Sequence, residues 1–551
     1  MDKLYVFAVG GSGERVMNSL VMLLAAGMEV GANEIVPVFI DNDVNSHALK
    51  TSLERIEYYN GELPEKIGFY KICDRARTST PSRKVSYCRV KIDAPIVLSE
   101  NQNGAAIGNL YNVIGTLDDD KKSFVDEIKI ERDLLFTEGD LKMPLDVGFI
   151  GNPNVGSVVM NCTSLNKKKK SESNKDKTKE YKDFSDIYHD VQSTDGVIVV
   201  GSLFGGTGAS GIPLIVNRFM EKNNSRPILA GLAILPYFTF APGDLCRNLR
   251  SDVSEYDVFA ESFDSKTRAA LIYYDQYMKQ LDYLYYVGDG DNKAVYEHHK
   301  GGNEQENPTH IVEMMSALSI IDFTFRGKTD DDSVIYKTPI WETLTNDDRT
   351  LNLSGIQQNI LSNSLIKFQM MKSIFDKKGM MDFYIRENAL FVESIAFKTD
   401  LLQKLLGENE PKGEDCWGLW HLFREWEDWL SQLQCNSNSC RAFRLFNNKA
   451  AKDSNNIKDD ITKCFYTERS EDEKDFGIAD FTMSGGIFSK KKKEPKKPEI
   501  MKALIKACKD AGDANRDKVD ADSDSLPKMI SYISEAIDEI INNSCLIGKI
   551  M

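Results

Sequence analysis

The sequence predicts an α/β fold built on a mainly parallel β-sheet. Two observations support this class. Short apolar runs alternate with helical apolar patterns from residue 3 to about residue 240, and this alternation is typical of strands connected by helices that cover both faces of a parallel sheet. Clusters of glycine, Asx residues or proline directly follow the apolar runs. Because the carboxyl ends of parallel strands meet at one edge of a sheet, we expect these clusters to form one ligand crevice.

The expected elements follow in order along the chain. A helix is predicted over residues 13–27, where Val16, Leu20 and Leu24 share one face. A second helix is predicted over residues 307–325, with Pro308 in its first turn. The expected strands cover residues 5–9, 35–40, 146–150, 197–200, 227–234 and 281–287.

The second half of the chain has a different pattern. Leu419, Phe423, Trp426 and Leu430 recur at helical spacing, which indicates a helix with a buried aromatic face and favours core packing over a ligand site. Residues 529–541 form a strongly amphipathic terminal pattern that suits docking on the same chain or on a protein partner.

Two lysine-rich segments interrupt these patterns. Residues 166–182 and 489–498 lack apolar side chains, so we expect a mobile insertion and a linker. A solvated loop is the simpler interpretation of both. Contact with an acidic lipid, a nucleic acid or an acidic protein is the functional alternative.

Composition limits the possible function classes. The net charge of −15 over 551 residues argues against nucleic acid as a general partner, because phosphate backbones require a basic surface. No apolar run is long enough to span a membrane. The first residues match a β-strand rather than a signal peptide, and the ten cysteines form no C-x-x-C pair. We therefore expect a cytoplasmic protein with reduced thiols.

The glycine-rich segment at residues 201–211, G-S-L-F-G-G-T-G-A-S-G, is the strongest functional signal. It lies between a predicted strand and a predicted helix, an arrangement that presents backbone N–H groups to an anion. The segment lacks the lysine of a Walker-type loop. A phosphate here would be held by N–H groups, by Thr207 and Ser210, and by a metal ion. A flexible glycine turn is the structural alternative.

Four loops in order resemble those of the tubulin/FtsZ superfamily of GTP-binding, filament-forming proteins. A-V-G-G-S-G-E at residues 8–14 is similar to its first phosphate loop, and I-D-N-D-V-N-S-H-A-L at residues 40–49 to its second. G-F-I-G-N-P-N-V-G at residues 148–156 resembles the third loop, A-N-P-E-x-G. F-G-G-T-G-A-S-G at residues 204–211 resembles the signature G-G-G-T-G-[ST]-G. The similarity covers roughly residues 3–325 and is that of a divergent prokaryotic tubulin-like protein.

The resemblance implies a site for GTP or GDP with Mg²⁺. It also implies self-association into filaments or oligomers, with slow hydrolysis completed by an acid after the central helix of the next subunit, here Asp322. Phe204 replaces the first signature glycine and Phe325 a second acid, for which Asp330, Asp331 and Asp332 are candidate substitutes. The implied nucleotide-binding residues are Gly10, Gly11, Ser12, Gly13, Asn42, Asp43, Asn152, Asn154, Gly156, Gly205, Gly206, Thr207, Gly208, Ala209 and Ser210.

The expected domain organisation follows from these patterns. It comprises a nucleotide-binding domain of tubulin/FtsZ type over residues 1–305, a central helix over 306–326, a second α+β or mostly helical domain over 327–485, a basic linker over 486–499 and a helical tail over 500–551. One alternative is a catalytically weak nucleotide-binding scaffold or sensor that recruits partners through its C-terminal half. Another is an oxidoreductase with a dinucleotide in the same crevice. The base and the cellular process stay open.

Overall fold

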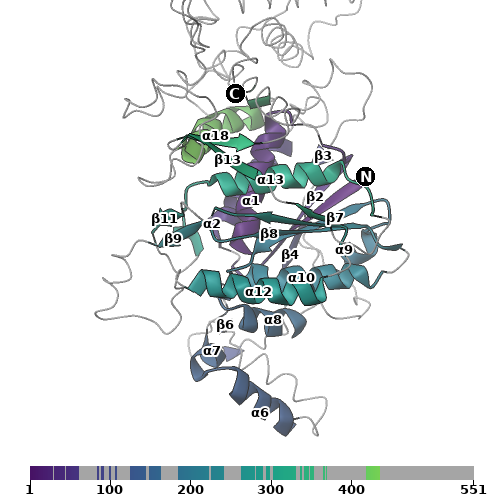
Figure 1. The fold of residues 1–551 in the computed structure, drawn as a ribbon, viewed down its shortest axis with the longest axis vertical. Helices are drawn as coiled ribbons and strands as arrows, with labels where there is room; N and C mark the ends of the chain where they lie inside the picture. Colours follow the sequence, from purple (N-terminus) through teal and green to yellow (C-terminus); the bar gives the residue numbers. More distant parts are fainter. Residues whose placement is uncertain are drawn as a thin grey trace, which may run out of the picture.

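The computed structural model describes most of the predicted first domain, the central helix and parts of the chain beyond it (Figure 1). The described residues are 1–60 except 29 and 44; 84–85, 88–91, 99–100 and 106–107; 125–162 except 144, 146–147 and 150; 184–240 except 223–224; 262–329 except 279–280, 290–292 and 298–301; 335–337, 340–345, 348–352, 364–365 and 368; and 417–434.

A sheet of eight strands forms the centre of the structure, and its described pairings are all parallel. The order is β12-β10-β8-β7-β1-β2-β3, with β4 also pairing with β2. β1 and β7 lie in the middle, and their side chains are almost entirely buried, as expected for strands covered on both faces. The strands are β1 (Lys3–Val9), β2 (Glu34–Asp41), β3 (Lys84–Val85), β4 (Cys88–Lys91), β7 (Gly196–Ser202), β8 (Ile228–Ile234), β10 (Tyr283–Val287) and β12 (Ile335–Lys337).

Helices cover both faces of this sheet (Figure 1). One layer contains α1 (Gly10–Ala25), α2 (His47–Asn60), α13 (Ile311–Thr324) and α18 (Trp417–Gln434). The other contains α8 (Pro153–Cys162), α9 (Phe184–Asp190), α10 (Gly206–Met220) and α12 (Phe263–Tyr277). The coarse prediction of a mainly parallel α/β fold is therefore confirmed.

Smaller elements lie around this core. β9 (Phe238–Phe240) pairs in parallel with β11 (Ala294–Tyr296), and β13 (Ile340–Thr345) forms an antiparallel hairpin with β14 (Asp348–Asn352). The remaining elements are β5 (Ser99–Glu100), β6 (Ala106–Ile107), α6 (Val125–Leu135), α7 (Glu138–Lys142) and the 3-10 helix η4 (Gly302–Glu304).

Three predicted boundaries differ from the structure. α1 begins at Gly10 rather than at residue 13, so the first glycine loop is the first turn of the helix. Leu145, Gly148 and Phe149, the described residues around the strand expected at 146–150, are not in a strand. Gly148 has φ +84°, a left-handed conformation that extended strands do not contain. α13 begins at Ile311, after Pro308, because His310 forms the cap.

α18 confirms the buried aromatic face predicted for the second half. Leu419, Phe423, Trp426 and Leu430 are all buried. The helix packs on α2 and α1, where Arg55 Nε lies 2.6 Å from Glu425 Oε2 and Trp429 Nε1 donates to Ser19 Oγ at 3.3 Å. The lysine-rich insertion, the basic linker, the terminal helix and Asp330, Asp331 and Asp332 lie outside the described residues.

Candidate functional site

The four predicted loops meet at the carboxyl edge of the central strands. Gly10, after β1, faces the first turn of α10, where a Cβ at Gly10 would lie 3.1 Å from Thr207 Cβ. Gly148 faces Asp41 and Thr207, with its Cβ position 3.5 Å from Asp41 Oδ1. A Cβ at Gly206 would lie 3.0 Å from the backbone N of Asn152. Segments separated by up to about 200 positions in the sequence thus form one site.

Glycines at this edge, Gly151 at φ +65° among them, have conformations that other residues rarely adopt. Gly10 has φ +76° and Gly148 has φ +84°, in the left-handed region that disfavours side chains. Gly11, next to Gly10, has open space where a Cβ would stand. The edge therefore combines side-chain-free backbone, in conformations that glycine adopts readily, with accessible space, which suits close approach by a ligand.

The N-termini of α1 and α10 lie side by side at this edge, and within the described structure neither helix has a side-chain cap. Val9 and Gly205 occupy the two N-cap positions. The first N–H groups of a helix have no intrahelical acceptor, and the helix dipole adds partial positive charge there. Two such termini together place several N–H donors and partial positive charge at this edge, an arrangement that suits an anion.

The third loop is built differently, because its asparagine caps its own helix. Asn152 Oδ1 accepts from the backbone N of Asn154 at 3.1 Å and of Val155 at 3.3 Å, and Asn152 Nδ2 donates to Asp140 Oδ1 at 2.7 Å. Asn154 is exposed, and Gly156 packs under Ser210. Asn152 thus shapes the loop with a side chain that is already bonded.

Asp41 is the central acidic residue of the site, although sequence reasoning selected its neighbours. Its Oδ1 accepts from the backbone N of Asn42 at 2.7 Å and from Thr207 Oγ1 at 3.4 Å. Burial raises the pKa of Asp41 to about 6, against hydrogen bonds from the backbone N–H groups of Asp43 and Asn42 that lower it. An acid at the last position of β2, before Asn-Asp, was the signal that could have identified it.

Asn42 and Asp43 complete the second loop. Asn42 is partly exposed. Asp43 is buried, and its carboxylate accepts from the backbone N of Asn45 at 3.1 Å and of Gly302 at 2.7 Å. Asp43 therefore holds the loop in shape and ties it to η4, and Asp41 faces the glycine turn.

The hydroxyls of the signature loop have different roles. Thr207 donates to Asp41, so it bridges two loops. Ser210 is buried and donates to the Gly206 carbonyl at 2.7 Å within its own helix. Ser210, predicted to contact phosphate through its side chain, is turned inward and stabilises the turn instead.

The remaining glycines and Ser12 position the backbone. Gly13 lies against β1 and β7, where a Cβ would be 2.8 Å from both Ala8 C and Val200 O. Gly208 packs similarly on Ser202. Ser12 is partly exposed beside Gly11. These contacts set how deeply the first turns of α1 and α10 sit on the sheet.

Phe204, the departure from the signature triplet, is part of a buried aromatic cluster. Its ring centroid lies 4.7 Å from that of Phe263, 5.5 Å from Phe238 and 6.3 Å from Tyr237. The substitution therefore fixes the start of the loop to β9 and α12 through aromatic packing.

An ionic network connects α1 to the start of α13. Arg15 Nε donates to Glu313 Oε1 at 2.6 Å, and the Tyr237 hydroxyl donates to the same oxygen at 2.9 Å. Arg15 also donates to the carbonyls of Asn307 and Pro308. His310 caps α13 through Nδ1, which accepts from Val312 N at 3.1 Å. Sequence periodicity carried no signal for this network, because its members come from three separate segments.

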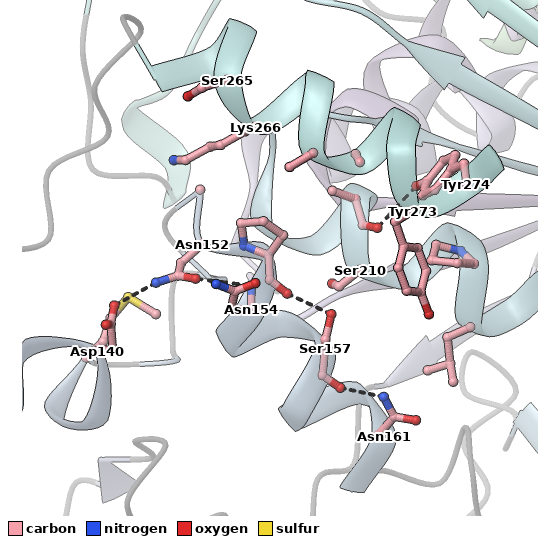
Figure 2. Close-up of a pocket in the computed structure, with 18 of the residues that line it drawn as sticks. Asp140, Asn152, Asn154, Ser157, Asn161, Ser210, Ser265, Lys266, Tyr273 and Tyr274 are labelled. Carbon is pink, nitrogen blue, oxygen red and sulfur yellow. Dashed lines mark hydrogen bonds between the residues drawn. The ribbon is translucent and has the colours of Figure 1, made fainter. Parts of the chain in front are cut away.

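A cavity of about 1190 Å³ lies on the outer side of α10, between α7, α8 and α12 (Figure 2). Four predicted site residues line it, namely Asn152, Asn154, Ala209 and Ser210. The glycine turn of α1 and Asp41 do not. The cavity therefore lies next to the loops at the carboxyl edge of the sheet, but the first turn of α1 and Asp41 are outside it.

Asp322 lies at the other end of α13, at the amino edge of the sheet. Gly31, which precedes β2, donates to Thr324 Oγ1 at 2.7 Å and marks this edge. Arg326 Nε donates to Asp322 Oδ2 at 3.1 Å, and the Tyr285 hydroxyl donates to the same oxygen at 2.8 Å. Phe325 beside it is 59% exposed. Asp322 is eleven residues after Ile311 and therefore lies about 17 Å along the helix axis from the start of α13. The start of α13 is the end that contacts α1 through Arg15.

The sequence matches no protein-family model and no curated protein. Within the described ranges, no cluster of three or more His, Cys, Asp or Glu side chains is arranged for a metal ion. Of the helices described, none is both long and apolar enough to cross a bilayer.

Proposed function

We propose that this chain binds GTP or GDP with Mg²⁺ at the carboxyl edge of the sheet and self-associates into filaments or oligomers, as a divergent relative of the tubulin/FtsZ superfamily. The observation that carries the proposal is the pair of adjacent, uncapped N-termini of α1 and α10. Their N–H groups suit an anion with several oxygens, and the side-chain-free Gly10 and Gly11 let it approach.

The donor chemistry at this edge fits Mg²⁺ as well. Mg²⁺ in phosphate sites takes one or two carboxylates and completes its shell with phosphate oxygens and water. Asp41 is the best-placed carboxylate, with Asn42 and Asp43 adjacent. A bound dication would favour the ionised form that burial now disfavours at Asp41. The metal would supply the charge neutralisation that a lysine gives in other phosphate loops.

The separation of Asp322 from the loops supports assembly in a head-to-tail arrangement. The two features lie at opposite edges of the sheet, so a second copy is needed to bring Asp322 near a nucleotide. Repeated contacts of this heterologous kind form filaments or rings. In that arrangement Asp322 would orient water at the terminal phosphate.

A catalytically weak scaffold or sensor is the second candidate function, and the contacts of Asp322 favour it over fast hydrolysis. Arg326 and Tyr285 both bind this carboxylate, which limits its capacity to accept a proton or a water. On this alternative the nucleotide is retained and the C-terminal half recruits a protein partner.

Sedimentation velocity tests the proposal and separates its two forms. The sedimentation coefficient of the purified chain is measured in the presence of GTP and Mg²⁺, in the presence of GDP and Mg²⁺, and without added nucleotide. The ligand released on denaturation is identified by mass spectrometry. A larger species with GTP supports the assembling protein. Stoichiometric bound nucleotide without a change in size supports the scaffold. A chain that carries no nucleotide when purified and binds neither GTP nor GDP contradicts both.

A further inference from the structure

Helix α10 has a proline in its interior, and the missing hydrogen bond falls on the phosphate loop. Pro213 lies inside α10, and proline has no backbone N–H. In an uninterrupted α-helix this N–H would bond to the carbonyl oxygen four residues earlier, which belongs to Ala209. Ala209 is part of the glycine-rich turn and is buried. Its carbonyl therefore needs a donor from outside the regular helix pattern.

Tyr274 of α12 supplies that donor. Its hydroxyl donates to the Ala209 carbonyl at 3.1 Å, and the side chain is 2% exposed. The dashed line beside Tyr274 in Figure 2 marks this bond at the wall of the cavity. Burial raises the pKa of the Tyr274 hydroxyl well above its ordinary value, so the phenol keeps its proton at neutral pH.

We propose that Tyr274 is a positioning residue for the phosphate-binding turn, because it replaces the hydrogen bond that Pro213 removes from α10. The proposal rests on the proposed nucleotide site. Gly206, Thr207 and Gly208 occupy the turn just before Ala209, and their N–H groups are those that face the ligand edge. A second helix, α12, thereby sets the geometry of a loop it does not belong to.

A double-mutant cycle between Tyr274 and Pro213 tests this role. The four proteins are wild type, Tyr274→Phe, Pro213→Ala and the double variant, each titrated with GTP and Mg²⁺. Tyr274→Phe leaves the buried Ala209 carbonyl without its donor, which should weaken binding about tenfold. Pro213→Ala restores a donor within α10, so the double variant should return to within about twofold of Pro213→Ala alone. A general packing role for Tyr274 would give no such rescue.

Hydrogen–deuterium exchange of the peptide spanning residues 206–220 gives a second readout that needs no ligand. Exchange should be faster in Tyr274→Phe and restored in the double variant. Tyr273→Phe, at a neighbouring position that is 45% exposed, serves as the control and should behave as wild type. If no protein binds nucleotide, the proposed function fails and the exchange data alone decide the inference.

Other outcomes are equally decisive. Equal affinity and exchange in wild type and Tyr274→Phe would overturn the proposal, as would a double variant no better than Tyr274→Phe. If Tyr274→Phe alone is insoluble, a soluble double variant supports the proposal, and an insoluble one contradicts it.

Discussion

The helices around the sheet begin in two different ways. α7, α8 and α13 are capped by side chains of the same chain, namely Thr137, Asn152 and His310. α1 and α10 begin with Val9 and Gly205 at the N-cap and have no side-chain cap in the described structure, and α12 begins after Ser262 without a side-chain cap hydrogen bond either. A helix end without a partner costs stability. The ends of α1 and α10 lie beside each other at the carboxyl edge, and we propose that a ligand binds to their N–H groups.

Adding a side-chain cap to α10 should have the largest effect on GTP affinity of the changes considered, because it occupies the N–H groups proposed to bind phosphate. Gly205→Asp places a carboxylate at the N-cap, where φ −86° and ψ 161° suit any residue. The new Cβ would lie 2.6 Å from Ser202 Oγ, so the buried Ser202 side chain must rotate to accommodate it. The ligand-free protein should gain about 0.5 kcal/mol, and GTP affinity should fall about 100-fold or more, because the new charge faces the phosphates. Calorimetric titration and thermal unfolding measure both.

Gly205→Ala is the matched control, since it adds the Cβ without charge or cap. Affinity for GTP should stay within about tenfold of wild type in that variant. A Gly205→Asp variant that still binds GTP like wild type would mean that phosphate does not use the α10 terminus.

Neutralising Asp41, the buried acid beside the uncapped start of α10, should change both the stability of the ligand-free protein and its affinity for GTP. The native pKa of about 6 lies above the unfolded value of about 3.9, so the native state holds this proton more tightly. The ligand-free protein therefore loses stability as the pH rises from about 4 through about 6, and the loss is complete above that. Asp41→Asn should remove this dependence and raise stability at pH 7 by about 2 kcal/mol.

The same Asp41→Asn variant should bind GTP about tenfold more weakly with Mg²⁺ present, and nearly like wild type in EDTA. Unfolding curves at pH 4 and pH 7, together with titrations with and without Mg²⁺, test both parts. Equal loss of affinity with and without metal would assign Asp41 a role other than metal binding.

A change at His310, the N-cap of α13, should alter the free energy of unfolding and have little effect on ligand binding. Burial and, to a smaller extent, the charge of Arg15 together lower the pKa of His310 to about 3. The unfolded chain therefore takes up the proton first, at about pH 6.5. Native stability should fall by about 2 kcal/mol between pH 7 and pH 5 from this residue alone.

His310→Asn keeps a capping acceptor and removes the titration. Denaturant unfolding of both proteins at pH 7 and pH 5 measures how much unfolding free energy each one loses between these pH values. The GTP affinity of His310→Asn at pH 7 should stay within about threefold of wild type. Identical pH dependence in the two proteins would show that His310 is not the residue that titrates.

Local sequence signals predicted much of the fold. The apolar runs before Gly10 and Gly201 gave the two central strands, and the spacing of Leu419, Phe423 and Trp426 gave α18. The order of the glycine and Asx clusters placed four loops at one edge, where the structure has them. These features depend on neighbours within a few positions, which periodicity and turn chemistry capture.

Features set by distant partners were not predictable. Nothing next to Asp322 showed that Tyr285 would bind it, and nothing next to Ala209 that Tyr274 would. The strand expected before Gly151 failed because Gly148 and Gly151 adopt positive φ, which composition alone does not fix. The role of Ser210 followed from its burial inside α10, where the nearest acceptor is its own helix.

Hydrogen–deuterium exchange of the wild-type chain with and without GTP and Mg²⁺ tests the central claim most directly. If the nucleotide phosphates bind at the N-termini of α1 and α10, exchange should be slower at the amides of residues 10–13 and 205–210 and unchanged at the capped N-termini of α7 and α13. Unchanged exchange at α1 and α10 in the presence of bound nucleotide, or protection confined to other segments, would contradict it.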